Sequence, residues 1–399
     1  MRGHFPVIHR GPTRRAVVGG LSALPFLPAT LHAQTEGRLR RAAEPLGIRI
    51  GSAVNFLNPP DADYLDLIRR ECNAVSPENA GKWKWVQPTP GDYEWQAMDD
   101  TVDFARQAGL KVNWHTLMWQ NGGMPDYMKL PDVDRPSSHQ AYDPYYSPDG
   151  TLSISNYWPR FRDFISTIAR HYGDIFYRID VANEPFLPHG SWLPDDLIDP
   201  HGFRKGNWWQ VAGGAGGPAW MDCFFEEARR QFPSARLVVN EFGVEAVHSQ
   251  KREKRGFLLD WIEGAVARGC PIDGVGLQSH LFARENYDTA AMSDFAARMK
   301  ELGLSIFITE MDVDTRDLPG NVSPSERHQM AADMAALHVR TMLEHGDLKE
   351  ITWWGISSRT SFLAKRGGVE AALEPTLFNA ALQPMPMYDA VATVLEEAA

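Results

Sequence analysis

Two short apolar runs, each ending in a glutamate, constrain this chain more than any other feature. Residues 179–184 and 306–310 are rich in β-branched side chains and stop at Glu184 and Glu310. Apolar runs of this length are typical of buried parallel strands. In α/β barrels the chemistry lies where such strands end, so the two carboxylates are predicted to share one site. Paired carboxylates are the groups that hydrolyse glycosidic bonds.

Strand-like runs recur along the chain with helical patterns between them. The eight runs occupy residues 48–54, 73–75, 111–117, 177–183, 237–240, 274–278, 305–309 and 351–354. In one intervening segment Met330, Met334 and Leu337 recur at helical spacing and are predicted to face the core. Because strand and helix alternate eight times, we expect an α/β fold, a single (β/α)8 TIM barrel over residues 34–399.

Most of the eight runs end in polar or aromatic residues. Such groups are predicted to project into one pocket at the C-terminal face of the barrel. They are Glu78, Asn79, Lys82, His115, Trp119, Asn183, Glu184, Asn240, Glu241, Gln278, His280, Glu310, Asp312 and Trp354.

Several of these residues also have an ordinary structural explanation. His115 and His280 alone would be taken for core histidines, but beside two carboxylates they are interpreted as hydrogen-bond partners that set protonation. For Asp180 and Asp312 the sequence is consistent with two roles, a structural one and support of the site residues. A lone glutamate at a strand end, such as Glu241, is more often a helix-terminus partner or a surface ion pair.

The N-terminus resembles a twin-arginine export signal. Arg14 and Arg15 precede a charge-free stretch over residues 16–33. We expect residues 1–33 to be removed after Ala33 and the protein to be exported, either to the periplasm or out of the cell. A disordered basic tail is the alternative. No later stretch has the roughly 18 apolar residues that a membrane span needs.

Charge and cysteine content exclude several classes of function. The formal net charge of −11 argues against nucleic acid or an anionic membrane as partner. Cys72, Cys223 and Cys270 show no metal-binding spacing, and an odd count makes no disulfide framework, so buried thiols are expected. Neither a cofactor nor a metal is implied.

Five ordered motifs resemble glycoside hydrolase family 10, the endo-β-1,4-xylanase family. The resemblance runs from about residue 46 to residue 395 and is specific because the motifs occur in order. The motifs lie at residues 73–83, 115–119, 180–184, 274–281 and 308–313, and the segment 377–388 resembles the closing part of the family.

The resemblance implies a barrel that cleaves β-1,4-xylan or xylo-oligosaccharides with retention of configuration. Asn183-Glu184 matches the acid/base motif and Glu310 the nucleophile. Matches to residues around the reactive sugar are Glu78, Asn79, Lys82, His115, Trp119, Asn183, Gln278, His280 and Trp354, with Asp180, Asp312 and Asn240 behind them. We expect a monomer.

Elementary chemistry assigns the two glutamates opposite protonation states. Glu310 must be ionised to attack, and hydrogen bonds from His280, oriented by Asp312, and from Asn183 are expected to keep it so. Glu184 must begin protonated, and burial beside a second carboxylate is expected to raise its pKa.

Departures from the family pattern cluster in the loops expected to contact substrate. Gln120, Glu241 and Met387 stand where the family commonly has His, Asp and Ala, and Ala80-Gly81 is also unusual. Residues 357–362 lack the usual Asp and place Phe362 where a Trp is expected.

Three alternatives follow from these departures and from the polar cluster. The first is a related retaining β-glycanase or aryl-xylosidase. The second is a sugar-binding protein with degenerate activity. The third is a metal enzyme, although no ligand spacing supports it.

Overall fold

The computed structural model describes residues 37–119, 123–128, 154–366 and 374–399. The predicted export signal at residues 1–33 and the unusual Gln120 lie outside the described residues. Residues 36–399 form one compact unit.

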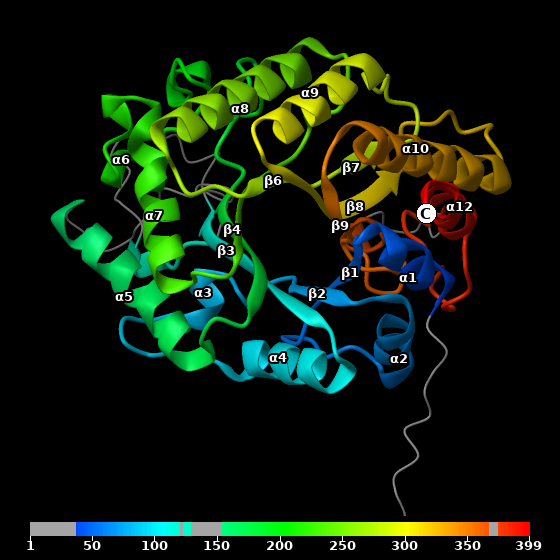
Figure 1. Cartoon of the computed structure of the whole chain (residues 1–399), viewed down its shortest axis with the longest axis horizontal. Coiled ribbons are helices and arrows are strands. Elements are labelled where there is room, and N and C mark those ends of the chain that lie inside the picture. The colour runs from blue at the N-terminus through cyan, green and yellow to red at the C-terminus, as the bar shows by residue number, and fades with distance from the viewer. Residues whose placement is uncertain (1–36, 120–122, 129–153, 367–373) are drawn as a thin grey trace, which may run out of the picture. The chain divides into compact units, whose positions relative to one another are not determined.

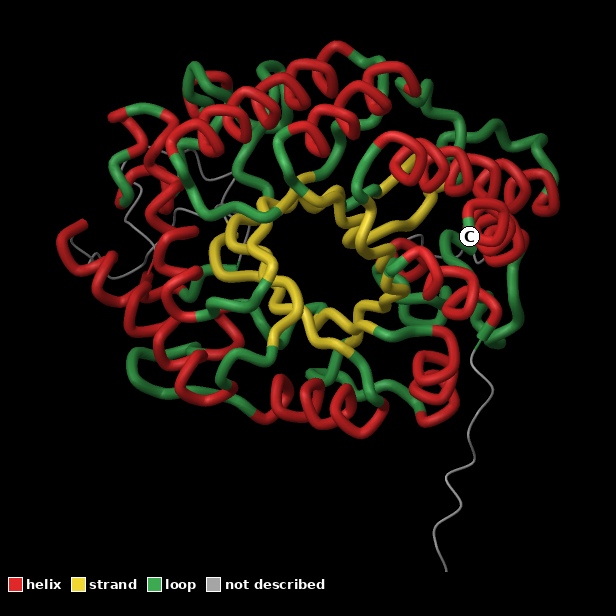
Figure 2. The backbone as a smooth tube through the Cα atoms, in the orientation of Figure 1, coloured by secondary structure: helices red, strands yellow, loops and turns green. Residues whose placement is uncertain are grey.

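Within the described residues, eight parallel strands close into a barrel (Figures 1 and 2). Neighbouring strands pair in chain order, and β1 closes the ring by pairing with β9. The strands are β1 (Arg49–Val54), β2 (Ala74–Pro77), β3 (Lys111–Trp119), β4 (Phe176–Asn183), β5 (Arg236–Glu241), β6 (Gly274–Leu277), β8 (Ser305–Asp314) and β9 (Leu348–Trp353). The (β/α)8 barrel predicted from the sequence is confirmed.

A short additional strand lies beyond the end of β6. β7 (His280–Phe282) follows after two residues and pairs in parallel with β8, so that His280 lies opposite Asp312. This pairing was not predicted, because three residues carry too little periodicity to be recognised as a strand. It places the predicted His280–Asp312 partners side by side.

Helices surround the ring of strands, as Figure 2 shows in red. Those that follow the barrel strands are α2 (Ala62–Glu71), α4 (Gln96–Ala108), α5 (Ile154–Tyr172), α7 (Asp222–Gln231), α8 (Ser249–Arg268), α9 (Thr289–Glu301), α10 (Pro324–His345) and α12 (Pro386–Ala398). Short helices in the N-terminal segment and the loops are α1 (Arg38–Ala43), α3 (Trp83–Val86), α6 (Asn207–Val211) and α11 (Phe362–Arg366). Because helices cover the outside of the sheet, all ten residues of β8 are buried.

The core prediction for α10 is right in part. Met334 is buried and Met330 packs against the core, but Leu337 is 38% exposed. Helix α10 instead buries small residues such as Ala331 and Ala335 together with the polar His338. Small side chains let the helix approach the barrel closely, and the methionine spacing alone does not reveal this.

Helices α1 and α12 lie side by side, so the described N-terminal segment meets the C-terminal helix (Figure 1). The Arg38 guanidinium pairs with Glu396 at 2.7 Å and Asp389 at 2.8 Å. Tyr388 donates a hydrogen bond to the buried Glu71 carboxylate of α2 at 3.1 Å. These contacts hold the C-terminal helix against the N-terminal part of the described chain.

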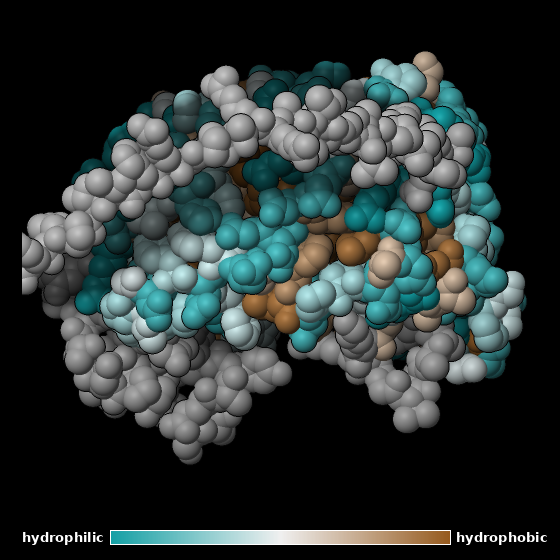
Figure 3. All heavy atoms as spheres, turned by 90° about the horizontal axis from the view of Figure 1, so that it is seen from below, coloured by the Kyte–Doolittle hydropathy of each residue, from teal (hydrophilic) through white to brown (hydrophobic). Residues whose placement is uncertain are grey.

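The face of the molecule in Figure 3 is mainly polar where it is coloured. In Figure 3 hydrophilic residues cover most of the coloured part of the face, with a smaller apolar area between them. Cys72, Cys223 and Cys270 are all free thiols, the first and last of them buried. None of the described helices combines the length and apolar character that crossing a membrane would require.

Candidate active site

The two glutamates predicted to carry the chemistry lie at the end of β4 and within β8. Glu184 follows the last residue of β4 and adopts a φ of 55°, which is uncommon for a residue with a side chain. Its backbone N–H donates to the carbonyl of Asn240 at 2.9 Å. Glu310 is buried, with 5% of its surface exposed. A positive φ at a residue with a side chain, as at Glu184, is typical of functional sites.

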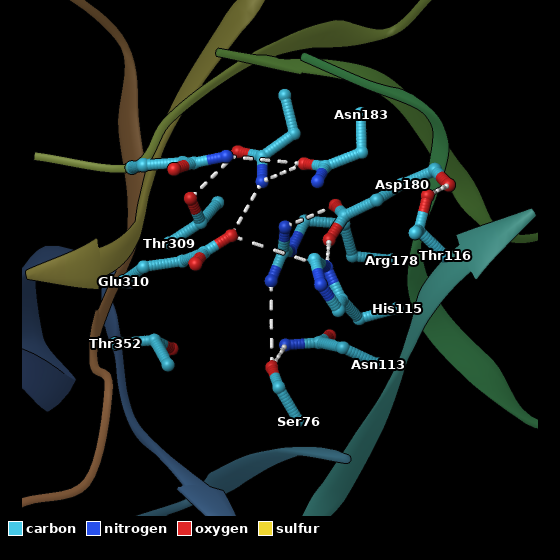
Figure 4. A network of polar contacts seen from close by, with 12 residues as sticks. Ser76, Asn113, His115, Thr116, Arg178, Asp180, Asn183, Thr309, Glu310 and Thr352 are labelled. Atoms are coloured by element: carbon cyan, nitrogen blue, oxygen red, sulfur yellow. Dashed lines mark hydrogen bonds and ion pairs between the residues drawn. The ribbon is translucent and has the colours of Figure 1, made fainter. Parts of the chain in front are cut away.

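Three amide side chains connect these glutamates, and Figure 4 shows the part of the network around Asn183, Thr309 and Glu310. Asn240 Nδ2 donates to Glu310 Oε1 and to Asn183 Oδ1, both at 2.8 Å. Gln278 Nε2 donates to the same Asn183 oxygen and to Glu184 Oε1, both at 3.2 Å. One continuous network therefore holds both carboxylates.

The prediction that Asn183 donates to Glu310 is wrong in its donor. Asn240 makes that bond, and Asn183 Nδ2 lies 3.5 Å from Glu184 Oε1. Thr309 Oγ1 donates to Asn240 Oδ1 at 2.7 Å, which turns the Asn240 amide nitrogen toward Glu310. The strand register places Asn240 opposite Asn183, and the sequence alone does not specify which of the two reaches β8.

His280 lies between two carboxylates. Its Nδ1 is 2.9 Å from Asp312 Oδ1 and its Nε2 is 3.4 Å from Glu310 Oε2. Burial lowers the pKa of His280, but Asp312 and Glu310 outweigh burial and hold it well above its ordinary value. His280 therefore presents a positive charge to the Glu310 carboxylate.

His115 lies near the other carboxylate oxygen of Glu310. Its Nδ1 is 2.8 Å from Asp180 Oδ2 and 4.0 Å from Glu310 Oε1. Asp180 also pairs with the fully buried Arg178 guanidinium. The ring of Trp354 packs edge-on against His115, with 5.1 Å between centroids. The Arg178–Asp180–His115 chain therefore fixes the ring that faces Glu310.

The residues after β2 form another side of the site. Asn79 Nδ2 donates to Glu78 Oε1 at 3.1 Å, and Lys82 Nζ donates to Asn79 Oδ1 at 3.0 Å. The Lys82 ammonium lies 4.5 Å from the ring centre of Trp119. Burial lowers the pKa of Lys82 to about 8, although Glu310 and other carboxylates oppose the shift. The geometry thus brings the predicted residues of β2 and β3 together beside the carboxylates.

The expected pKa direction of Glu184 is wrong for the substrate-free chain. Burial raises its pKa, but the Arg204 guanidinium, with hydrogen bonds from Trp119 and Gln278, outweighs burial and holds it below its ordinary value. Arg204 Nη2 lies 3.6 Å from Glu184 Oε2. No sequence pattern indicates this neighbour, because Arg204 lies in a long loop without periodicity.

Glu241 is neither a surface group nor a helix-terminus partner. It is fully buried at the end of β5 and pairs with Lys254 of α8 at 2.7 Å. Its other oxygen accepts a hydrogen bond from the backbone N–H of Phe186 at 3.0 Å. Burial raises the pKa of Glu241, with Lys254 opposing the shift. This ion pair lies near enough to Glu184 to interact with it electrostatically.

Two further departures from the family pattern lie in the loop after β9. Ser357 is buried and donates to the carbonyl of Asn379 at 2.7 Å, which attaches the loop to the C-terminal segment. Phe362 begins α11 and is 42% exposed. The loop is thus held by its serines and presents an aromatic residue at its end.

Arg178 is a member of the network that sequence reasoning missed. It is fully buried in β4, two residues before Asp180, and lies 3.2 Å from the buried Glu350 of β9. A signal was available, because charged residues two apart in an apolar run point to the same face of a strand. In the part of the chain that the structure describes, no cluster of three or more His, Cys, Asp or Glu residues is arranged to hold a metal ion.

Comparison with known proteins agrees with this geometry. The sequence model described as glycosyl hydrolase family 10 matches residues 38–394. The endo-1,4-beta-xylanase B of Thermotoga neapolitana is 27% identical over 363 residues, covering 90% of this chain and 92% of that protein. The exoglucanase XynX of Acetivibrio thermocellus is 27% identical over 345 residues, covering 86% of this chain and 28% of that longer protein.

A solved structure shares the whole fold. The crystal structure of xylanase 10B from Thermotoga petrophila RKU-1 in complex with xylobiose superposes with a TM-score of 0.73 and 26% identity, covering 90% of this chain and 97% of that chain. Since the family model spans nearly all of residues 36–399, and the barrel agrees with it, this chain belongs to glycosyl hydrolase family 10.

Proposed function

We propose that this protein is a retaining endo-β-1,4-xylanase, with Glu310 as nucleophile and Glu184 as acid/base. The observation that carries the proposal is the single amide network that joins the buried Glu310 carboxylate to the partly exposed Glu184 carboxylate at the C-terminal end of the barrel. Similarity to an endo-1,4-beta-xylanase and to a xylanase solved with xylobiose supports xylan or xylo-oligosaccharides as substrate.

The proposed first step forms a covalent glycosyl-enzyme. A Glu310 oxygen attacks the anomeric carbon, the bond to the leaving oxygen breaks, and that oxygen takes the bond's electron pair and the proton of Glu184. Asn240 and His280 hold Glu310 from two sides, at 2.8 Å and 3.4 Å, so its attacking geometry exists before substrate arrives.

The proposed second step returns the enzyme to its starting state. A water molecule gives a proton to Glu184 while the water oxygen bonds to the anomeric carbon. The ester bond between that carbon and Glu310 breaks, and its electron pair returns to the Glu310 carboxylate. Lys82 and Trp119 lie together beside the carboxylates, where they would contact the sugar. Two displacements at one carbon retain its configuration.

The experiment is an NMR time course of the full chain on xylohexaose, with a cello-oligosaccharide in parallel. The proposal expects β-anomer product first, from xylohexaose. Glu310→Ala should lose roughly 10⁴-fold or more in kcat. Glu184→Ala should lose far less on an aryl xyloside whose leaving group needs no proton, and added azide should restore part of its rate.

The same time course separates the alternatives. The exoglucanase XynX among the relatives favours a glucan-active enzyme as the second candidate, which would turn over the cello-oligosaccharide. Binding without turnover on either sugar would indicate a degenerate, sugar-binding barrel. α-Anomer product first would contradict the retaining mechanism.

We also propose that residues 1–33 direct export through the twin-arginine route. The paired Arg14 and Arg15 before a charge-free stretch support this. Replacing both with lysine should leave the protein in the cytoplasmic fraction of a bacterial host, whereas the unchanged chain should be exported and shortened.

A further inference from the structure

Glu184 has a buried cation on one side that the expected chemistry does not use. The side chain of Arg204 is 1% exposed, and its Nη2 lies 3.6 Å from Glu184 Oε2. The other carboxylate oxygen, Oε1, accepts from Gln278 Nε2 at 3.2 Å. The two oxygens of Glu184 therefore have different surroundings, an amide at one and a guanidinium at the other.

The loop after β4 fixes the position of Arg204. The chain leaves the barrel at Pro185 and returns, so that the Arg204 N–H donates to the Pro185 carbonyl at 3.0 Å. Phe186 and Phe203 pair across this return, with ring centroids 4.6 Å apart. On the outer side the ring of Trp192, which is 51% exposed, covers the guanidinium with 5.3 Å between ring centre and Cζ.

The other charges near Glu184 are largely paired with each other. Lys254 and Glu241 form a buried ion pair of 2.7 Å, so their effects on Glu184 oppose one another. The charged groups that face Glu184 are Arg204 from the loop after β4, Lys254 from α8, Lys82 before α3, Glu241 from β5 and, through the Asn240 and Asn183 amides, Glu310 from β8.

We propose that Arg204 is a positioning residue for Glu184, which holds the Oε2 edge of its carboxyl group and sets the pH above which Glu184 no longer carries its proton. A buried guanidinium beside a carboxylate favours the ionised form. Among the causes that lower the pKa of Glu184, Arg204 is the largest.

The consequence rests on the proposed function of Glu184 as the acid of the first step. Only the protonated form can give a proton to the leaving oxygen, so kcat/KM falls as the pH rises through the pKa of Glu184 in the free enzyme. A cation that lowers this pKa moves the fall to lower pH. Removing the cation must therefore extend activity toward alkaline pH.

The test is the pH profile of kcat/KM on xylohexaose for the full chain and its variants. The alkaline limb is the part of the profile where kcat/KM falls as the pH rises. In Arg204→Met this limb should move to higher pH by about one unit, which is about a tenfold gain in relative kcat/KM at a pH on the limb. Arg204→Lys keeps the charge and should move the limb less. Trp192→Ala, which opens the guanidinium to water, should move it in the same direction by a smaller amount.

Arg268→Met is the matched control. Arg268 pairs with Asp222 on the outer helices, with 2.6 Å between Nε and Oδ2, and should leave the limb in place. A merely structural Arg204 would lower kcat without moving the limb. An unmoved limb in a folded Arg204→Met variant would overturn the proposal.

A second measurement needs neither turnover nor an Arg204 variant. In ¹³C-carboxyl NMR of the full chain, with Glu184→Gln to assign the signal, Glu184 should titrate below the ordinary value of about 4.3. Titration at or above that value would also overturn the proposal. A chain that hydrolyses no sugar but shows the low titration would refute the proposed function and leave the role of Arg204 intact.

Discussion

At the scale of single residues, the site depends on which amide reaches which carboxylate. Asn240 and Asn183 are both asparagines at strand ends, yet Asn240 donates to Glu310 and Asn183 lies against Glu184. Thr309 decides this, because its hydroxyl donates to the Asn240 oxygen at 2.7 Å and so turns the Asn240 amide nitrogen toward Glu310. The positions were predictable from the sequence, but the partners were not.

This arrangement makes Asn240 a test of how closely Glu310 is positioned. Asn240→Ala removes the 2.8 Å donor to Glu310 and the 2.8 Å donor to Asn183 together. We expect kcat on xylohexaose to fall about 100-fold, the size of loss that follows a 1 Å misplacement of a reacting group.

A matched variant distinguishes this effect from general damage. Asn286 lies in the loop before α9, and its backbone carbonyl accepts a hydrogen bond from Val247 at 3.0 Å. Alanine keeps that carbonyl, so Asn286→Ala should keep wild-type kcat. An Asn240→Ala variant that retained wild-type kcat would show that Glu310 needs no amide donor.

Residues with no periodic signal mark the limit of prediction at this scale. Glu184, Glu310, His115 and His280 are predictable because each lies in or just after an apolar run. Arg204 was not, because its position follows from a loop that returns to Pro185, and only the folded backbone shows such a return.

At the scale of elements, α10 shows how a helix can be predicted while its buried face is not. The spacing of Met330, Met334 and Leu337 indicated the helix correctly, but Leu337 lies partly in water and His338 lies in the core. His338 Nε2 is 2.8 Å from the Ser279 hydroxyl and its Nδ1 is 2.9 Å from that of Tyr287. The helix therefore holds the segment between β6 and β7, which positions His280.

His338 predicts a loss of stability on acidification. Burial lowers its pKa to about 3, whereas an unfolded histidine titrates near 6.5. Below pH 6.5 His338 is protonated in the unfolded chain but stays neutral in the folded chain. The stability that depends on neutral His338 is therefore fully present above pH 6.5 and is lost as the pH falls. Between pH 7 and pH 4 the wild-type chain should lose about 3 kcal/mol of unfolding free energy through this group.

Urea unfolding at the two pH values measures this contribution. His338→Gln, which cannot titrate, should lose about 3 kcal/mol less between pH 7 and pH 4 than the wild-type chain. The control is His345→Gln, at the exposed end of the same helix, which should follow the wild-type pH dependence. Equal losses in His338→Gln and wild type would show that the His338 environment accepts a proton.

At the scale of the whole molecule, the barrel holds buried charge across its interior. Arg178 of β4 and Glu350 of β9 are both fully buried and lie 3.2 Å apart, although three strands separate β4 from β9 around the ring. Asn113 of β3 and Thr352 of β9 also donate to Glu350, each at 2.8 Å. The barrel was predictable because apolar runs fix its strands, but an ion pair between distant strands depends on which residues point inward at the same level.

This cross-barrel pair should behave as a coupled unit. Arg178→Met leaves Glu350 buried without its cation, and Glu350→Met leaves Arg178 without one of its anions. Each single variant should therefore lose about 3–5 kcal/mol of unfolding free energy. The double variant should lose less than the two losses combined, by about 0.5–3 kcal/mol, because no charge of the pair is then left alone.

The double-mutant cycle compares the wild-type chain, the two single variants and the double variant, each unfolded with guanidinium chloride. Arg298→Met removes an exposed ion pair with Glu263, which water and salt screen, so it should cost little stability and controls for the loss of an arginine. Strictly additive losses would mean that Arg178 and Glu350 stabilise the barrel independently, with Asp180 as the main partner of the guanidinium. A positive coupling would mean that the interior charges of β4 and β9 stabilise the barrel as one unit, so that the Asp180–His115 side of the site is held from across the barrel.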